Sequence, residues 1–209
     1  MPNDMNITVE PGLDWKANDT IALPSTTMNW FEMDTADITS YNNVTGVATL
    51  NKKLSYYHWG APSSTGPQYN GVDMRGEVML LTRNIKIRGN DTDAWGCQVV
   101  TSDFVEANLE QRIGRTFMDN VEIYNCSQYD TWKSAIRFEG AVLGFSRISN
   151  SAIHHGLGIA GHITFSENVE LINNNVYTFL RYGLVIQTSK NITFNGNWVS
   201  GIFSRKIIM

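Results

Sequence analysis

A repeat of 23 positions near the end of the chain constrains the fold more than any other sequence feature. Residues 167–176 match residues 190–199 at this spacing, and the positions that coincide are Asn168 with Asn191, Asn174 with Asn197, Val169 with Ile192, Leu171 with Phe194, and Val176 with Val199. A self-similar period of about 20 to 50 residues is typical of a solenoid, in which each repeat packs against its neighbours. The chain is therefore expected to stack repeats along an axis.

The local pattern within each repeat selects the kind of solenoid. Apolar residues alternate with polar ones over short runs, as in β-strands, and no 3.6-residue period runs through the repeats. Strands joined by unequal turns favour a right-handed parallel β-helix, and Asn suits its turns because it tolerates left-handed backbone angles. One structural position is predicted to be shared by Ile123, Ile153, Val176 and Val199.

The domain organisation follows from where this repeat begins. Residues 1–75 read as a β-rich, sandwich-like region, with short strands predicted at 36–41, 47–50 and 54–57 and a loop at 60–71. Parallel β-helix repeats are predicted for residues 76–209, with residues 104–112 as the one helical candidate. The last coil carries apolar residues and no capping helix, so we expect the β-helix to continue further or to be completed by a partner.

Composition narrows the partners of such a protein. The formal net charge of -4 and the scattered basic residues give no electrostatic basis for binding nucleic acid. No stretch approaches the roughly 18 apolar residues needed to span a bilayer. The first residues lack the basic and apolar segments of a signal peptide, which alone would favour the cytosol.

Glycosylation sequons favour an extracellular or cell-surface location instead. Asn-x-Ser/Thr sequons begin at Asn6, Asn18, Asn43, Asn90, Asn125 and Asn191. The chain has two cysteines, Cys97 and Cys126, whose separation is close to one long coil. They are compatible with one disulfide on neighbouring coils, and equally with two buried thiols.

Residues 70–85, with the sequence NGVDMRGEVMLLTRNI, resemble a motif of the fibrocystin-like and cell-surface hyaluronidase family. These extracellular proteins join an eight-glycine domain to parallel β-helix repeats, and the similarity covers roughly residues 13–203. It implies that residues 1–75 are the end of an eight-glycine domain and that the chain is part of a glycoprotein. The hyaluronan-degrading members are expected to carry His-x-His where this chain has Arg137 and Glu139, which argues against that chemistry here.

Candidate catalytic residues are few. If the chain were an enzyme, His154 or His155 with Arg137 and Glu139 would form its site, although neighbouring strand residues are expected to point to opposite faces. The plainer interpretation of each is a turn residue or a surface ion pair. Trp95 and Trp132 are candidates for stacking on sugar rings, although a structural role is the plainer interpretation. No metal site or cofactor motif is predicted.

We therefore expect a non-catalytic structural or adhesive module of an extracellular coat or filament, without a cofactor. Its partners would be other chains of the same or a related assembly, joined through the uncapped β-helix end, with glycans as further ligands. The alternatives are a polysaccharide-degrading enzyme of the hyaluronidase or lyase type, and a glycan-binding module without catalysis.

Overall fold

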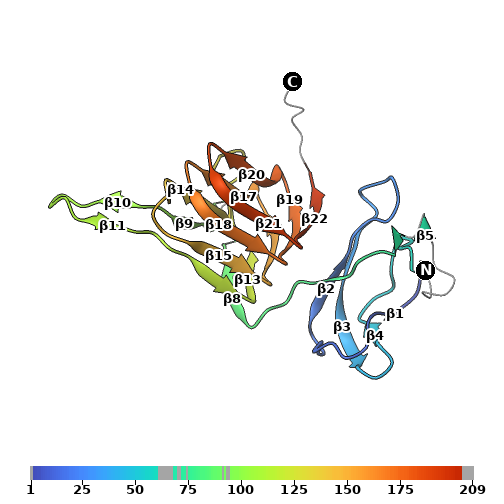
Figure 1. Ribbon diagram of the computed structural model, residues 1–209. Helices are drawn as coiled ribbons and strands as arrows, with labels where there is room; N and C mark the ends of the chain where they lie inside the picture. Colours follow the sequence, from blue (N-terminus) through green and yellow to red (C-terminus); the bar gives the residue numbers. More distant parts are fainter. Residues whose placement is uncertain are drawn as a thin grey trace. The chain divides into compact units, whose positions relative to one another are not determined.

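The computed structural model describes residues 2–60, 68–69, 72–73, 75–90, 92 and 95–203. Residue contacts divide the chain into two compact units, Met1–Thr82 and Arg83–Met209 (Figure 1). The division lies after residue 82 and not after residue 75, because strand β7 (Met79–Leu80) pairs with β2 (Thr20–Leu23) in the first unit. Residues 70, 71 and 74 of the family motif lie outside the described residues, as do residues 204–209 of the predicted last coil.

The first unit is built on an antiparallel sheet with the strand order β1-β4-β3-β2-β7. The remaining strands of this sheet are β1 (Asn6–Thr8), β3 (Asp34–Asn42) and β4 (Val47–Leu50), and a separate pair is formed by β5 (Gln68–Tyr69) and β6 (Val72–Asp73). Alternate residues of β3 are buried, as its polar and apolar pattern requires. They pack with β2 and β4 into a small core that includes Ile21, Ile38 and Leu50. The described part of this unit thus contains one main sheet where the sequence suggested a sandwich.

The coils of the second unit are formed by three parallel sheets that the chain visits in turn (Figure 1). Sheet 1 contains β12 (Phe117–Asp119), β15 (Ser146–Ser149), β18 (Glu167–Ile172) and β21 (Lys190–Asn195). Sheet 2 contains β8 (Ile85–Arg88), β13 (Val121–Tyr124), β16 (Ala152–Gly156), β19 (Asn175–Phe179) and β22 (Trp198–Ile202). Sheet 3 contains β9 (Val99–Thr101), β14 (Ile136–Glu139), β17 (Ile159–Thr164) and β20 (Tyr182–Gln187). The parallel β-helix predicted from the repeat is confirmed.

The register of the strands confirms the predicted alignment of the coils. In sheet 2, Ile123 pairs with Ile153, Ile153 with Val176, and Val176 with Val199. The first of these steps is longer than the others because the chain between β13 and β14 forms an extended turn. Inward-facing residues of all three sheets form one core, with Phe138 fully buried in it.

The turns between sheets 1 and 2 show why Asn recurs in this sequence. Asn120, Asn150, Asn173 and Gly196 occupy the same place in successive coils, with φ angles of 57°, 50°, 52° and 63°. This left-handed conformation costs most residues about 1 kcal/mol or more, and Gly and Asn adopt it most readily. The recurring Asn is therefore a consequence of the backbone geometry at each corner.

A column of side-chain hydrogen bonds runs beside these turns and joins each coil to the next. The backbone N–H of Val121 donates to Ser151 Oγ (3.1 Å), that of Ser151 to Asn174 Oδ1 (3.0 Å), and that of Asn174 to Asn197 Oδ1 (2.9 Å). Asn174 Nδ2 also donates to the carbonyl oxygen of Ile148. Buried polar groups without partners are costly, so this column fixes how the coils stack.

Asn174→Ala should therefore destabilise the second unit although it removes no apolar contact. The substitution leaves the N–H of Ser151 and the carbonyl of Ile148 without their partners in a buried place, and we expect a loss of about 2–3 kcal/mol in the free energy of unfolding. Asn173→Gly is the matched control, because Gly already occupies this turn position in the next coil. Urea unfolding should give a lower midpoint for Asn174→Ala and a midpoint close to that of wild type for Asn173→Gly. Equal midpoints in the two variants would contradict the role of the column.

A β-hairpin interrupts the β-helix between β9 and β12. It is formed by β10 (Phe104–Val105) and β11 (Gln111–Arg112), which are antiparallel. The prediction of a helix at residues 104–112 is wrong. The chain turns back because Leu109 takes a left-handed conformation, with φ of 67°, and closes a short turn with its N–H on the Glu106 carbonyl.

Candidate functional site

The four residues considered for catalysis lie on two different sheets. Arg137 and Glu139 are on β14 of sheet 3, whereas His154 and His155 are on β16 of sheet 2. Each sheet forms its own side of the β-helix, so the structure does not bring the histidines together with the Arg and Glu pair. The enzyme site proposed from the sequence is therefore not assembled in this fold.

Arg137 and Glu139 form an ion pair along the same strand. Arg137 Nη2 lies 2.8 Å from Glu139 Oε2, and the Glu139 side chain is half exposed. The neighbour of Arg137 on β17 is His162, whose Nε2 contacts Gln187 Oε1 at 3.1 Å. The contact between Arg137 and Glu139 at the outer face of sheet 3 fits the plainer interpretation as a surface ion pair.

The two adjacent histidines lie on the same side of their strand, contrary to the expected alternation. The φ angle of His155 is 53°, a left-handed conformation that breaks the strand pattern, and its Nδ1 lies 2.8 Å from that of His154. The same coil position is left-handed at Asn125, Thr178 and Gly201. The sequence held this signal in the Asn and Gly at equivalent positions, but it becomes clear only when the coils are aligned.

An aromatic cluster surrounds this histidine pair. The ring of Tyr124 lies 5.2 Å from that of His154 and 5.7 Å from that of His155, and Tyr177 lies 5.8 Å from His155. Arg88 places its guanidinium 5.0 Å from the Tyr124 ring. Burial and the neighbouring His154 lower the pKa of His155 to about 4, so this imidazole is neutral at pH 7.

Glu122 is the charged residue next to the histidine pair. One carboxylate oxygen lies 2.9 Å from Lys86 Nζ and accepts the backbone N–H of Arg83 at 2.9 Å; the other lies 3.7 Å from His154 Nε2. Burial alone raises the pKa of this carboxyl, but His154, Lys86 and the Arg83 N–H outweigh it and lower the pKa of Glu122 to about 2. The group therefore acts as a buried anion that ties β8, β13 and β16 together.

The stability of the second unit should consequently fall in acid. A carboxyl whose pKa is lower in the folded chain stabilises the fold above its unfolded pKa, near 4.5, and this stabilisation is lost as the pH falls towards about 2. Glu122→Gln should flatten this dependence, whereas Glu139→Gln, at a half-exposed side chain, should leave it steep. Urea unfolding between pH 5 and pH 2 measures both slopes; identical slopes in the two variants would contradict the assignment.

The described residues contain no cluster of three or more His, Cys, Asp or Glu side chains that could hold a metal ion. Of the two candidate tryptophans, Trp132 lies against the Arg181 guanidinium at 4.8 Å and stacks on Tyr182 at 6.3 Å. Lys133 lies 5.4 Å from the Trp95 ring. Both rings therefore have cationic neighbours within the chain, and their sugar-stacking role stays a prediction.

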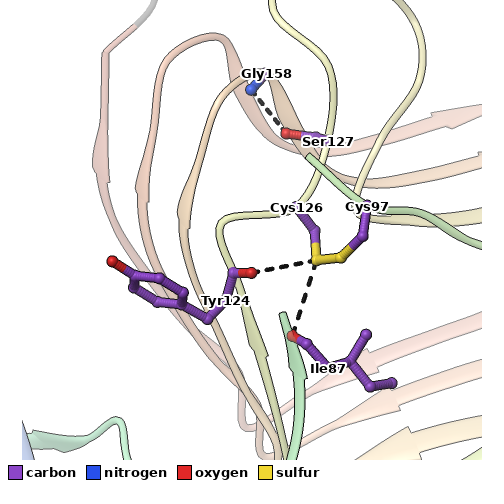
Figure 2. The surroundings of a disulfide bond; sticks show 6 residues. All are labelled: Ile87, Cys97, Tyr124, Cys126, Ser127 and Gly158. Atoms are coloured by element: carbon purple, nitrogen blue, oxygen red, sulfur yellow. Dashed lines mark hydrogen bonds between the residues drawn. A yellow bond between two sulfur atoms is a disulfide. The ribbon is translucent and has the colours of Figure 1, made fainter. Parts of the chain in front are cut away.

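Cys97 and Cys126 form a disulfide between the first two coils (Figure 2). Cys97 lies before β9 and Cys126 follows β13, so the bond joins equivalent turns of neighbouring coils. The backbone N–H of Ser127 donates to the Cys97 carbonyl (2.7 Å), and Ser127 Oγ accepts the N–H of Gly158 (2.7 Å). Covalent and hydrogen bonds thus connect three successive coils at this corner.

The sequons differ in accessibility. The exposed ones are at Asn6, Asn18, Asn43, Asn90 and Asn191. Asn125 is 8% exposed and stands directly before the disulfide-bonded Cys126. Asn125 is therefore the least accessible of the six sequons, which the sequence could not reveal because its motif is the same as that of the others, and glycosylation at each of them stays a prediction.

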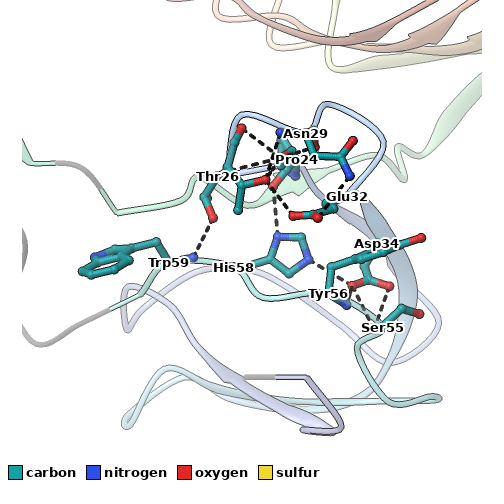
Figure 3. Close-up of polar contacts among 11 residues, drawn as sticks. Pro24, Thr26, Asn29, Glu32, Asp34, Ser55, Tyr56, His58 and Trp59 are labelled. Atoms are coloured by element: carbon teal, nitrogen blue, oxygen red, sulfur yellow. Dashed lines mark hydrogen bonds and ion pairs between the residues drawn. The ribbon is translucent and has the colours of Figure 1, made fainter.

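The first unit contains a buried ion pair that the sequence did not indicate (Figure 3). His58 Nε2 lies 3.0 Å from Asp34 Oδ2, and His58 Nδ1 lies 2.9 Å from the Pro24 carbonyl oxygen. Asp34 also accepts the backbone N–H groups of Ser55 and Tyr56, which explains why the strand predicted at 54–57 is a loop. Burial alone would raise the pKa of Asp34. The hydrogen bonds with His58 and with these N–H groups outweigh this effect, so the pKa of Asp34 lies below its usual value.

Both acceptors of His58 are oxygen atoms without a hydrogen to donate when Asp34 is ionised. Only the imidazolium form, with a hydrogen on each ring nitrogen, satisfies both at once. The pair holds residues 55–58 against β3 and the end of β2. Because its members are 24 positions apart and carry no motif, no local pattern could have found it.

Comparisons with known proteins agree with this architecture. The family model described as "Right handed beta helix region" matches residues 114–205. The chain is 28% identical to mouse (Mus musculus) fibrocystin over 199 residues, which are 95% of this chain and 5% of that protein. It is 26% identical to human (Homo sapiens) fibrocystin-L in an alignment of 202 residues, which covers 88% of this chain and 5% of that protein.

The chain therefore spans about one twentieth of the length of these relatives. The predicted likeness of residues 1–75 to an eight-glycine domain stays a prediction. The described residues contain no helix that is long and apolar enough to cross a membrane. The coils of the second unit form a parallel β-helix that matches the right-handed β-helix family model over residues 114–205, and the chain as a whole is similar to fibrocystin and fibrocystin-L.

Proposed function

We propose that this chain is a non-catalytic structural module of an extracellular or cell-surface glycoprotein. The observation that carries the proposal is the continuous register of three parallel sheets, reinforced at the corners by side-chain hydrogen bonds and one disulfide. Backbone ladders that continue from coil to coil make a stiff rod, which suits a coat or filament. No cofactor enters this function.

The extracellular location rests on two features of the surface chemistry. A disulfide persists in oxidising compartments and is rare in the cytosol. An exposed sequon outside the strands, such as that at Asn43, can accept a glycan without disturbing the sheets. Secreted protein treated with an endoglycosidase and analysed by peptide mass spectrometry should show modification among the exposed sequons and none at Asn125. Occupancy of Asn125 in folded protein would contradict the buried position of this residue.

The rival proposal is an enzyme of the hyaluronidase or lyase type. It would need acidic groups, histidines and Arg137 around one groove, whereas His154 and His155 lie on a different sheet from Arg137, and all three engage neighbours within the chain. Incubation of the purified protein with hyaluronan and related glycans, with and without calcium, should yield no shortened product. Product formation that His154→Ala abolishes would overturn the structural proposal, and retention on glycan arrays without product would favour the binding alternative.

We also propose that other chains of the same or a related assembly join at the last coil. Within the part of the chain that the structure describes, its strands β20, β21 and β22 lie at the edges of their sheets, and Ile186, Phe194 and Val199 are more than one third exposed there. Edge strands with apolar neighbours readily pair with a further strand. Removal of residues 190–209 should abolish assembly through this coil while the preceding coils stay soluble, and light scattering would report the loss of the larger species; an unchanged size distribution would contradict this role.

A further inference from the structure

The hairpin of β10 and β11 is an added feature of the β-helix surface. It occupies the corner between sheets 3 and 1 in the first coil, where the last coil needs only residues 188–189 to pass from β20 to β21. In Figure 1 it projects away from the stacked coils. Phe104 and Val105 are 58% and 60% exposed and, being adjacent in a strand, face opposite sides of it. A projecting hairpin that shows apolar side chains on both faces is typical of an interaction surface.

The base of the hairpin is held in place by one carboxylate. Asp103 accepts the backbone N–H groups of Gly114, Val142 and Leu143, each at 2.8 Å. Burial alone would raise the pKa of Asp103. The hydrogen bonds from these N–H groups outweigh this effect and bring the pKa below its usual range, so the Asp103 carboxylate is charged at neutral pH. The hairpin is therefore fixed to the following coil and is pre-formed for binding.

The hydrogen-bond register shows which backbone groups of the hairpin face outwards. The N–H of Glu106 donates to the carbonyl of Glu110 at 2.8 Å, so these residues form a hydrogen-bonded pair. Bonded and non-bonded pairs alternate along an antiparallel ladder. The next pair, Val105 and Gln111, therefore directs its N–H and C=O groups away from the hairpin. Among the described residues no third strand joins this sheet, so both edges are open.

The sequence of β11 is complementary to itself. If a second copy pairs antiparallel to it about Gln111, the Gln111 residues exchange two backbone hydrogen bonds. Within one chain Arg112 contacts Glu106 (2.7 Å) and Glu110 (2.9 Å). In the pair, Glu110 also lies opposite Arg112 of the second copy, and Arg112 opposite its Glu110, so these ion pairs become shared between the copies. Opposite charges across a strand pair are favourable. The same operation on β10, about Val105, would set Phe104 against the carboxylate of Glu106, which is unfavourable.

We propose that β11 is a self-association strand, which joins two copies of this chain into a symmetric four-stranded sheet through Gln111 and the reciprocal Glu110 and Arg112 pairs. A two-fold interface uses the same patch on both copies, as this strand permits. Short strand addition buries little area, so the association is weak and depends on concentration and salt. This contact is separate from the assembly proposed at the last coil, because it needs none of residues 190–209.

Charge variants test the pairing directly by sedimentation velocity over a range of concentrations at low salt. Arg112→Glu sets like charges opposite each other twice, as does Glu110→Arg, and each should weaken self-association by about tenfold or more. An equimolar mixture of the two variants restores both opposite-charge pairs and should form a one-to-one complex. Lys52→Glu, a matched charge change at an exposed residue of the first unit, should behave as wild type.

Proline variants test which edge is used. Gln111→Pro removes an N–H that points away from β10, so it should abolish self-association and keep the hairpin. Val105→Pro removes the equivalent N–H on the other edge and should leave self-association intact. A wild-type chain that stays monomeric at every concentration would overturn the proposal. So would a mixture of charge variants that fails to associate, or equal effects of the two prolines.

Discussion

Phe138→Ala should cost about 3–5 kcal/mol in the free energy of unfolding of the β-helix. Phe138 lies in the middle of β14, is fully buried, and belongs to the core formed by all three sheets. Removing its ring leaves a cavity that the surrounding coils cannot close without breaking their ladders. A loss of this size is comparable to the whole stability of many domains, so the variant should populate a partly unfolded β-helix.

Phe165→Ala is the matched control for this experiment. Phe165 is 62% exposed at a corner between sheets 3 and 1, so its loss should change stability by about 0.5 kcal/mol or less. Amide hydrogen exchange resolved over β13 to β19 measures the effect in the β-helix separately from the first unit. Faster exchange throughout these strands is expected for Phe138→Ala only. Equal protection in both variants would show that the three sheets do not share one core.

Removal of the disulfide by Cys97→Ser with Cys126→Ser should cost about 3–4 kcal/mol. The bond closes a loop between residues 29 positions apart, and the chain-entropy model relates its contribution to that length. The change should appear as a lower urea midpoint. A reductant should shift the wild-type chain to the same midpoint and leave the double variant unchanged. A reductant effect on the double variant, or none on the wild type, would contradict the assignment.

The coils of the β-helix could be predicted because their determinants are local and repeat. Each corner between sheets 1 and 2 needs a left-handed residue, and Asn or Gly appears there at Asn150, Asn173 and Gly196. Strand residues alternate because successive side chains face the core and the solvent. The alignment of Val176 with Val199 followed from these two requirements, and the strand register confirms it.

The irregular parts of the molecule could not be predicted in the same way. The hairpin at residues 104–112 has too few strand residues to show a period, so it resembled a short helix. The Asp34 and His58 pair joins residues far apart in sequence, and only the folded sheet brings them together. His155 was expected to face away from His154, because the left-handed angle that brings both rings to one side becomes apparent only when the coils are aligned.

The sequence by itself determined the class of fold, the spacing of the coils and the positions of the corners, because a solenoid repeats the same local requirements in every coil. The tertiary structure alone decided which chemistry is possible. It placed Arg137 and His154 on different sheets, buried Asn125 and left the outer edge of β11 open. Each of these outcomes depends on which coil lies beside which, and the physical reason is that burial and pairing arise between coils and not within them.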